Sequence, residues 1–491
     1  MSGSEIAELE SSARHRRRRR VAHERRDVAF EGRPQVTVCA PSNRVEPTRE
    51  LFQLAWPIAA AMLGETALGL VDTKLVSGLG PAALGGVGIA TTLMFLGYSM
   101  VFGLMRGVKV RTAHAIGEGR PQDGFVYARS GVLMGAVVGV AIMLACRDVS
   151  GLLRALGTDP SIVPFARDFL AAVTLGAPSA CAMSALIQHR QAIGDARTPM
   201  VIGIAGNVFN AVFAWGLIYG HLGLPACGVR GGGWATAATQ SLDLAALALM
   251  FVRSERRARG AASADGTGET VTLRGAMRRV AELGVPTGAQ FAVETLAFTA
   301  MTGVLARLGS REIAAHQIAL SVIRVSFLPG VAIGEAASVL AGRALGQRRL
   351  DAADAVVKSA LRLAVGFMAS CGLVFALGGG LIAGSFSNDP ALVAIARRLL
   401  LVAAVFQVLD AIGIVLRGAL RGARDVRVPA MIGVSVIWLC VPTSAYLLGH
   451  VWGLGAVGGW IGFVGETTLG AALYSLRWSR GAWRKDFAPR R

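Results

Sequence analysis

Cysteine is scarce in this sequence, and its spacing excludes two classes of small site. The six cysteines, at positions 39, 146, 181, 227, 371 and 440, lie far apart and form no CxxC or CxxH pair. We therefore expect neither a zinc site nor a disulfide framework. The phosphate-binding pattern GxxxxGKS/T and the catalytic patterns GxSxG and HExxH are also absent, so we expect no ATP-binding loop, no enzyme activity and no cofactor.

Charge is also scarce. Only 16% of the residues are charged, against roughly 25% in soluble domains, and long uncharged stretches alternate with short clusters of Arg. Because a charge at the centre of a membrane span costs several kcal/mol, this pattern is typical of lipid-embedded helices joined by loops. The basic residues behind the net charge of +19 lie beside apolar segments. We therefore expect membrane lipid, and not nucleic acid, as their partner.

Twelve apolar segments are present, each near the roughly 20 residues that a bilayer-spanning helix needs. The first six lie at about 51–75, 82–106, 126–146, 163–187, 200–220 and 231–252. The second six lie at about 280–305, 313–341, 358–383, 394–416, 428–449 and 456–476. The predicted fold class is therefore an all-α integral membrane protein with twelve transmembrane helices.

Polar stretches divide the chain into five parts. Residues 1–48 contain a basic run at 15–20 but no apolar signal core, so we expect a disordered basic cytoplasmic arm and not a secretory signal. The longest internal polar stretch, 253–278, is predicted to be a cytoplasmic linker. It separates an N-terminal lobe (49–252) from a C-terminal lobe (279–480), which a basic cytoplasmic tail (481–491) follows.

Lys and Arg concentrate in alternate loops, which indicates topology. The basic loops lie around 107–125, 188–199, 253–279, 342–358 and 417–427. Because basic loops stay in the cytoplasm, both termini are predicted to be cytoplasmic. High Ala, Gly and Arg usage is typical of a bacterial source, and we expect a monomer in the inner (plasma) membrane.

The second half of the sequence repeats the first at a shift of 229 positions. The matched positions are Leu54 and Pro57 with Leu283 and Pro286, Glu65-Thr66 with Glu294-Thr295, and, at a shift of 230, Asp195 and Pro199 with Asp425 and Pro429. Since each repeat has six spans, both point the same way through the membrane. They should be related by a pseudo-twofold axis along the membrane normal, with a cleft between them, which favours a secondary transporter that works by alternating access.

Short motifs follow one another in a fixed order from residue 50 to 480. In the first half they are Leu-Ala-Trp-Pro at 54–57, Gly-Leu-Val-Asp-Thr at 69–73, Ala-Ile-Gly-Glu-Gly at 115–119 and Gly-Asp-Ala-Arg-Thr-Pro at 194–199. In the second half they are Val-Glu-Thr-Leu-Ala-Phe at 293–298, then Asp410, Leu-Arg-Gly at 416–418 and Leu-Arg-Gly-Ala-Arg-Asp at 420–425. The ordered set resembles the landmarks of the bacterial multidrug and toxic compound extrusion (MATE) transporters, NorM- and DinF-like.

The resemblance implies two six-helix lobes and export of cationic, amphipathic compounds, driven by inward flow of Na⁺ or H⁺. By position it implies cation-site roles for Glu294 and Asp410, where Na⁺ would bind, and a coupling role for Asp72. The sequence departs from the family pattern at Lys74, close behind Asp72, and at Arg324, inside a predicted span. A cation beside Asp72 would weaken its part in coupling.

Carboxyl groups inside predicted spans are candidate site residues on physical grounds too, because partners or function must meet the cost of placing them there. Glu294 and Asp410 lie in mid-span. The structural alternative for Glu294 is a carboxyl that is hydrogen-bonded between helices or paired with Arg324. For Asp410 it is an ion pair with Arg417, which lies seven positions further along nearly the same helix face.

Two further acids lie in the first span. Glu65 and Asp72 are seven positions apart, about two turns along one face, so they can line one cavity together. The repeat relation of Glu65 to Glu294 supports a role for Glu65. Asp72 lies nearer the predicted outer end of the span, where a solvated carboxylate is ordinary. Asp243 and Glu335 have only their predicted depth in favour of a role.

Two other functions remain open at this stage. A lipid-linked precursor flippase of the same broad fold would need a basic central cavity able to hold pyrophosphate, for which Arg324 is the one mid-span indication. An exporter of one specific metabolite or signalling compound is the other.

Overall fold

The computed structural model describes residues 47–147, 149–155, 157–261 and 271–487, and these residues form helices without any strand. The predicted N-terminal arm lies outside the described residues, except that the first described helix already begins at Pro47. The predicted linker at 253–278 is helical at both ends, and its residues 262–270 are not described.

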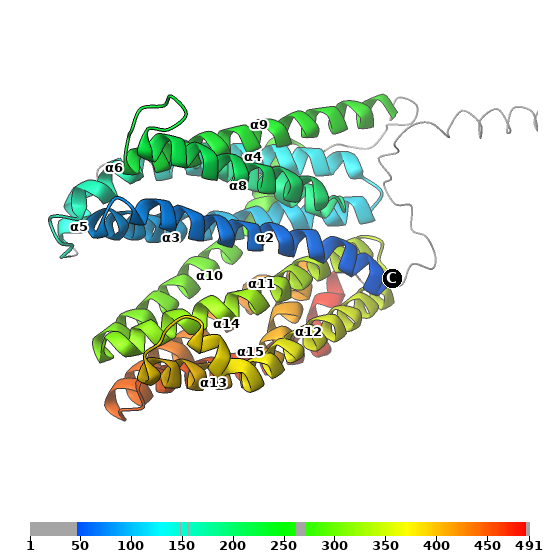
Figure 1. Cartoon of the computed structure of the whole chain (residues 1–491). Coiled ribbons are helices and arrows are strands. Elements are labelled where there is room, and N and C mark those ends of the chain that lie inside the picture. The colour runs from blue at the N-terminus through cyan, green and yellow to red at the C-terminus, as the bar shows by residue number, and fades with distance from the viewer. Residues whose placement is uncertain (1–46, 148, 156, 262–270, 488–491) are drawn as a thin grey trace, which may run out of the picture. The chain divides into compact units, whose positions relative to one another are not determined.

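The described helices fall into two lobes (Figure 1). Lobe 1 contains α2 (Pro47–Ser77), α3 (Pro81–Gly117), α4 (Pro121–Ala145), α5 (Ser150–Ala155), α6 (Val163–Val173), η1 (Thr174–Gly176), α7 (Ala177–Ala192), α8 (Arg197–Tyr219) and α9 (Val229–Ala261). Lobe 2 contains α10 (Leu273–Leu308), α11 (Ser310–Gly346), α12 (Leu350–Gly384), α13 (Pro390–Gly422), α14 (Arg427–Ser444), η2 (Ala445–Val451), α15 (Gly455–Arg480) and η3 (Ala482–Asp486).

Eleven helical segments among the described residues are long and apolar enough to cross a membrane, with α6 to α7 forming one of them. The twelfth predicted span, 456–476, is α15, which is 26 residues long but less apolar. All twelve predicted spans are helical, and the fold class is confirmed: an all-α integral membrane protein with two lobes of six transmembrane helices.

Helix ends extend into segments that were predicted to be basic loops. Helix α3 continues to Gly117, so Lys109 and Arg111 lie within it, and Lys109 is buried. Helix α13 likewise continues to Gly422 and buries Arg421. The prediction of basic loops at 107–125 and 417–427 was therefore wrong in part, because several of these cations are packed inside the protein.

The internal repeat is visible in the backbone. Helices α3 and α11 each have 37 residues, and each follows a glycine with positive φ, Gly80 (101°) or Gly309 (133°). The repeat-related Gly117 and Gly346 face each other, since a Cβ built on either would lie 3.0 Å from the Cα of the other. Equivalent residues contact each other only beside a twofold axis, so the predicted pseudo-twofold passes between the ends of α3 and α11.

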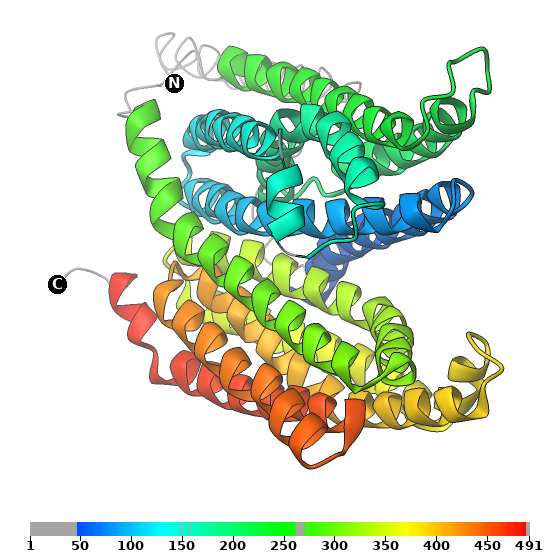
Figure 2. The same ribbon diagram turned by 90° about the vertical axis from the view of Figure 1, so that its left-hand side faces the viewer.

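The lobes meet at one end of their helices, which we call the basic end: the end with the connections 118–120, 193–196, 347–349 and 423–426. There the first turns of α2 join a buried apolar cluster with α11, α12 and α13, in which Leu51 is fully buried. Helix α10 packs along α3 of the other lobe and, as Figure 2 shows, runs obliquely between the two sets of helices. Toward the other end each lobe packs on itself, as in the contact of Trp460 with Phe406.

Replacing Gly288 with Val should lower the thermal unfolding temperature of the purified protein. A Cβ at position 288 would lie 2.5 Å from the carbonyl oxygen of Met100, so α10 and α3 would have to separate. Such overpacking costs about 1–3 kcal/mol. The control is Gly303→Val on the same helix, where a Cβ meets nothing within 4 Å. Equal unfolding temperatures for the two variants would contradict the close contact.

Candidate functional site

An acid cluster lies inside lobe 2 and contains both carboxylates that the sequence predicted there. Glu294 comes from α10, Asp410 from α13 and Glu466 from α15, and the guanidinium of Arg417, on α13, lies among them. Arg417 Nη1 lies 3.1 Å from Glu294 Oε1. Gln290, one turn before Glu294, donates its side-chain amide to the same oxygen at 2.7 Å.

The other two carboxylates of the cluster have no such partner. Asp410 and Glu466 are half-buried, and neither makes a hydrogen bond or ion pair with another described residue. Glu466 interacts electrostatically with Asp410, Arg417 and Glu294, so a change of charge on one of the four groups is felt by the others. With three carboxylates and one guanidinium, the cluster carries two formal negative charges that the described protein does not pair.

Gly433 on α14 makes room for this arrangement. A Cβ at position 433 would lie 2.7 Å from both Gln290 Nε2 and Glu294 Oε1, and 3.0 Å from the hydroxyl of Tyr474. The polar groups of α10 and α15 therefore lie directly against the backbone of α14. Any larger residue at position 433 would push Glu294 out of place.

The two ion pairs considered as structural alternatives are not formed. Arg417 pairs with Glu294 and not with Asp410, because its long side chain reaches across to α10 instead of back along α13. Arg324 does not pair with Glu294, since it is exposed on α11. Sequence reasoning also missed Glu466, although its place in the middle of the last predicted span is the same signal that selected Glu294 and Asp410.

The predicted acids of lobe 1 form no comparable cluster. Glu65 is exposed on α2. Asp72 is half-buried, and Lys74 makes no ion pair with it in the described part of the chain. Asp243 lies against Gly206 of α8, where a Cβ would be 2.5 Å from its carboxylate.

A second charged cluster lies between the lobes, and we call it the closure cluster: Arg106 and Lys109 of α3, Glu335 of α11 and Arg421 of α13. Arg106 Nη2 and Lys109 Nζ each lie 2.7 Å from a carboxylate oxygen of Glu335, and Arg421 Nη1 lies 2.9 Å away. All four side chains are buried. Three cations thus share one carboxylate, and two of them come from the opposite lobe.

Two side chains fasten helix ends across the same interface. His114 Nε2 of α3 donates to Gly422 O at the end of α13, at 2.7 Å. Arg343 Nε of α11 donates to Ala192 O at the end of α7, at 3.1 Å. His114 and Arg343 are related by the repeat shift of 229, and Ala192 and Gly422 by 230, so these are equivalent contacts on the two sides of the axis. Both satisfy carbonyls that a helix C-terminus leaves unpaired.

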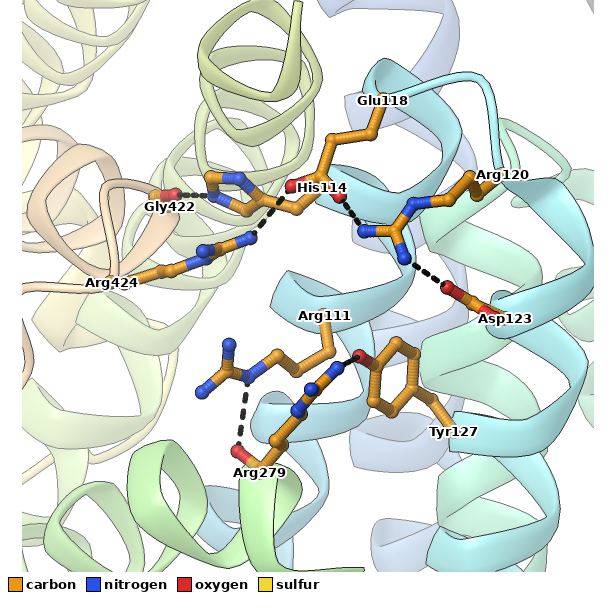
Figure 3. A network of polar contacts seen from close by, with 9 residues as sticks. All are labelled: Arg111, His114, Glu118, Arg120, Asp123, Tyr127, Arg279, Gly422 and Arg424. Atoms are coloured by element: carbon orange, nitrogen blue, oxygen red, sulfur yellow. Dashed lines mark hydrogen bonds and ion pairs between the residues drawn. The ribbon is translucent and has the colours of Figure 1, made fainter. Parts of the chain in front are cut away.

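A more exposed network covers the closure at the basic end (Figure 3). Glu118, just after α3, binds Arg424 of lobe 2 at 3.2 Å and also pairs with Arg120. The hydrogen bond to Glu118 raises the pKa of the Arg120 guanidinium above its ordinary value, so the guanidinium stays charged. Arg111 of α3 donates to Arg279 O of α10, and Arg279 donates to the hydroxyl of Tyr127 on α4.

The described residues contain no group of three or more His, Cys, Asp or Glu side chains arranged to hold a metal ion. The acid cluster offers carboxylate oxygens, which suit Na⁺, but Glu294 already forms an ion pair with Arg417. Na⁺ binding at Glu294 and Asp410 therefore remains a prediction.

A family model matches much of the chain: the MatE model covers residues 57–215 and 286–447, one segment in each lobe. The multidrug resistance protein NorM of Burkholderia vietnamiensis is 32% identical over 449 residues, covering 90% of this chain and 96% of that protein. The chain belongs to the MATE family.

Solved structures share the fold of this MATE chain. The eukaryotic MATE transporter AtDTX14 matches with a TM-score of 0.80 at 19% identity, covering 90% of this chain and 97% of the other. A MOP superfamily transporter from Pyrococcus furiosus Vc1 matches with a TM-score of 0.80 at 20% identity, covering 93% and 99%. A multidrug resistance MATE transporter in an outward-facing conformation matches equally well, with the same TM-score, identity and coverage.

Replacing Glu335 with Gln should strongly destabilise this MATE protein, because three buried cations would lose their shared carboxylate. Breaking a buried ion pair by removing one partner costs about 3–5 kcal/mol. The control is Glu282→Gln, which removes a half-exposed carboxylate that pairs with Arg111 and Arg278 and should cost at most about 1 kcal/mol. The measurement is thermal unfolding of both purified variants in detergent. Similar losses in the two would show that the closure cluster contributes no more than a surface pair.

Proposed function

We propose that this protein is a secondary exporter of cationic, amphipathic compounds, driven by inward flow of Na⁺ or H⁺ through alternating access. The observation that carries the proposal is the acid cluster of lobe 2, in which three carboxylates face one guanidinium inside the membrane. Placing unpaired charge in a membrane protein is costly and marks ion or substrate pathways. A cavity with surplus negative charge attracts both a coupling cation and an organic cation.

In this proposal Glu294, Asp410 and Glu466 bind the coupling ion and the substrate cation in turn. Competition for one set of carboxylates couples the two fluxes, since only one of the two cations can occupy the site at a time. Asp410 and Glu466 are the groups open to a new partner, because each lacks a hydrogen bond or ion pair to a described residue. Glu65 and Asp72 offer a second, separate set of carboxylates in lobe 1.

The closure at the basic end supports alternating access. The excess of Lys and Arg at this end favours a cytoplasmic location for it. The lobes pack together there through the closure cluster and the helix-end contacts, and toward the other end they pack internally. In this proposal the structure is the state that is closed toward the cytoplasm, and transport requires these inter-lobe contacts to separate.

The flippase alternative is less well supported. It needs a basic cavity for pyrophosphate, but Arg324 is exposed, and the three cations of the closure cluster already share Glu335. The similarity to a protein named for multidrug resistance also favours an exporter of drugs. Export of one specific metabolite stays compatible with the same site, provided that the metabolite is cationic.

The test is ion flux in proteoliposomes upon addition of ethidium, for the wild type and for Glu294→Gln, Asp410→Asn and Glu466→Gln. We expect each variant to lose most of the ethidium-triggered flux of H⁺ or Na⁺, by about tenfold or more, since a charge-specific contact is removed. The control is Asp351→Asn, an exposed carboxylate in the first turn of α12.

The outcomes separate the possibilities. Running the assay with a proton gradient alone and with a Na⁺ gradient alone identifies the coupling ion. Normal flux in all three cluster variants would move the coupling site to Asp72 and Glu65 of lobe 1. Absence of flux in the wild type with any organic cation would reject the proposal.

A further inference from the structure

Arg417 is the one feature of the acid cluster that the proposed function does not explain. A site that collects cations has no evident need of a resident guanidinium, yet Arg417 binds Glu294 directly. The repeat shows that the fold does not require it, because the position of lobe 1 related to Arg417 by the shift of 230 is Ile187. The position related to Asp410 is Ala180, so the charges at both positions are specific to lobe 2.

Glu294 has little room for a further partner while Arg417 is bound. Its Oε1 already accepts hydrogen bonds from Arg417 and from Gln290, and the backbone of Gly433 closes off one side. Side-chain exposure is 12% for Glu294 and 21% for Arg417. A cation that is to bind Oε1 of Glu294 must therefore replace the guanidinium.

Arg417 also connects the acid cluster with the closure cluster. It lies one helical turn before Arg421 on α13, and the two guanidinium groups repel each other. Arg417 binds the carboxylate inside lobe 2, whereas Arg421 binds Glu335 between the lobes. Arg417, Arg421 and Asp425 line one small cavity beside Gln290, so the two guanidinium groups border the same space.

We propose that Arg417 is a tethered cation that fills the acid cluster when no substrate is bound, and that an incoming cation displaces it toward Arg421. This rests on the proposed function, in which the cluster binds cations. The displaced charge approaches a region where three cations already share one carboxylate, so it weakens the closure of the basic end. Arg417 thus links the arrival of a cation in lobe 2 to the opening of the cytoplasmic side.

The first test is binding of tetraphenylphosphonium to the purified full-length protein, measured by equilibrium dialysis. Arg417→Gln should bind it at least about tenfold more tightly than the wild type, because a competing buried charge pair is removed. Arg417→Lys restores a tethered cation and should bind less tightly than Arg417→Gln. Arg324→Gln removes an exposed cation of α11 and should match the wild type.

A double variant locates the effect. In Glu294→Gln with Arg417→Gln the gain should disappear, because the carboxylate that the two cations compete for is gone. Equal affinity of the wild type and Arg417→Gln, or failure of both to bind, would overturn the proposal. Tighter binding by Arg417→Gln combined with no transport by the wild type would instead reject the proposed function alone.

The second test follows the link to the closure by hydrogen–deuterium exchange of the ends of α3 and α11. Tetraphenylphosphonium should increase exchange at 105–117 and 335–346 in the wild type, because the displaced guanidinium loosens the closure cluster. In Arg417→Gln, at saturating ligand, the increase should be absent. An equal increase in both proteins would show that Arg417 does not carry the signal.

Discussion

The ion pair between Arg106 and Glu335 is the contact around which the rest of the interface is arranged. The two residues are 229 positions apart, which is the repeat shift, so they occupy equivalent positions in the two lobes. Equivalent residues that meet must lie beside the pseudo-twofold axis, where a duplicated sequence places like against like. Two identical charges there would repel, whereas an Arg opposite a Glu attracts. Beside the axis, opposite charges thus meet at Arg106 and Glu335, and two small residues meet at Gly117 and Gly346.

Around this pair the symmetry holds for the contacts that join the lobes and breaks for the charges of the acid cluster. The contacts of His114 and Arg343 with helix ends are equivalent on the two sides, and both serve to join the lobes. The acid cluster has no such counterpart, because Asp410 and Arg417 are replaced in lobe 1 by Ala180 and Ile187. Only Glu65 and Glu294 persist as a pair. The shared scaffold therefore carries a different electrostatic task in each lobe.

Much of this architecture could be predicted from sequence, because the length of the apolar segments and the positions of charges between them can be read along the chain without knowledge of its packing. The twelve spans, the repeat and the choice of Glu294 and Asp410 as candidate site residues all follow from such patterns. The partner of Arg417 could not be predicted, since spacing along one helix favours Asp410 and only the packing of α10 against α13 brings Glu294 closer. The cations at 106–111 and 421 looked like loop charges because their burial depends on contacts with the other lobe.

The ion pair on the axis also has a signal in the sequence. Applying the shift of 229 to charged residues, and not only to matching ones, pairs Arg106 with Glu335 and so predicts an ion pair on the axis. Depth in the membrane was the only argument for a role of Glu335, because its partner lies in the other repeat. In a duplicated membrane protein, opposite charges at equivalent positions are therefore informative in themselves, since the axis brings such positions together.

In the proposed transport cycle, the surplus of cations around Glu335 lets one interface be both firm and able to open. A purely apolar contact would respond to no distant charge, whereas a carboxylate shared by three cations responds to any further charge nearby. Each of the three depends on the same two oxygens, so a fourth positive group weakens all of them together. The closure is stable while that fourth charge is held in the acid cluster, one turn away on α13. The stability of the closed state is thus tied to the occupancy of the site within lobe 2.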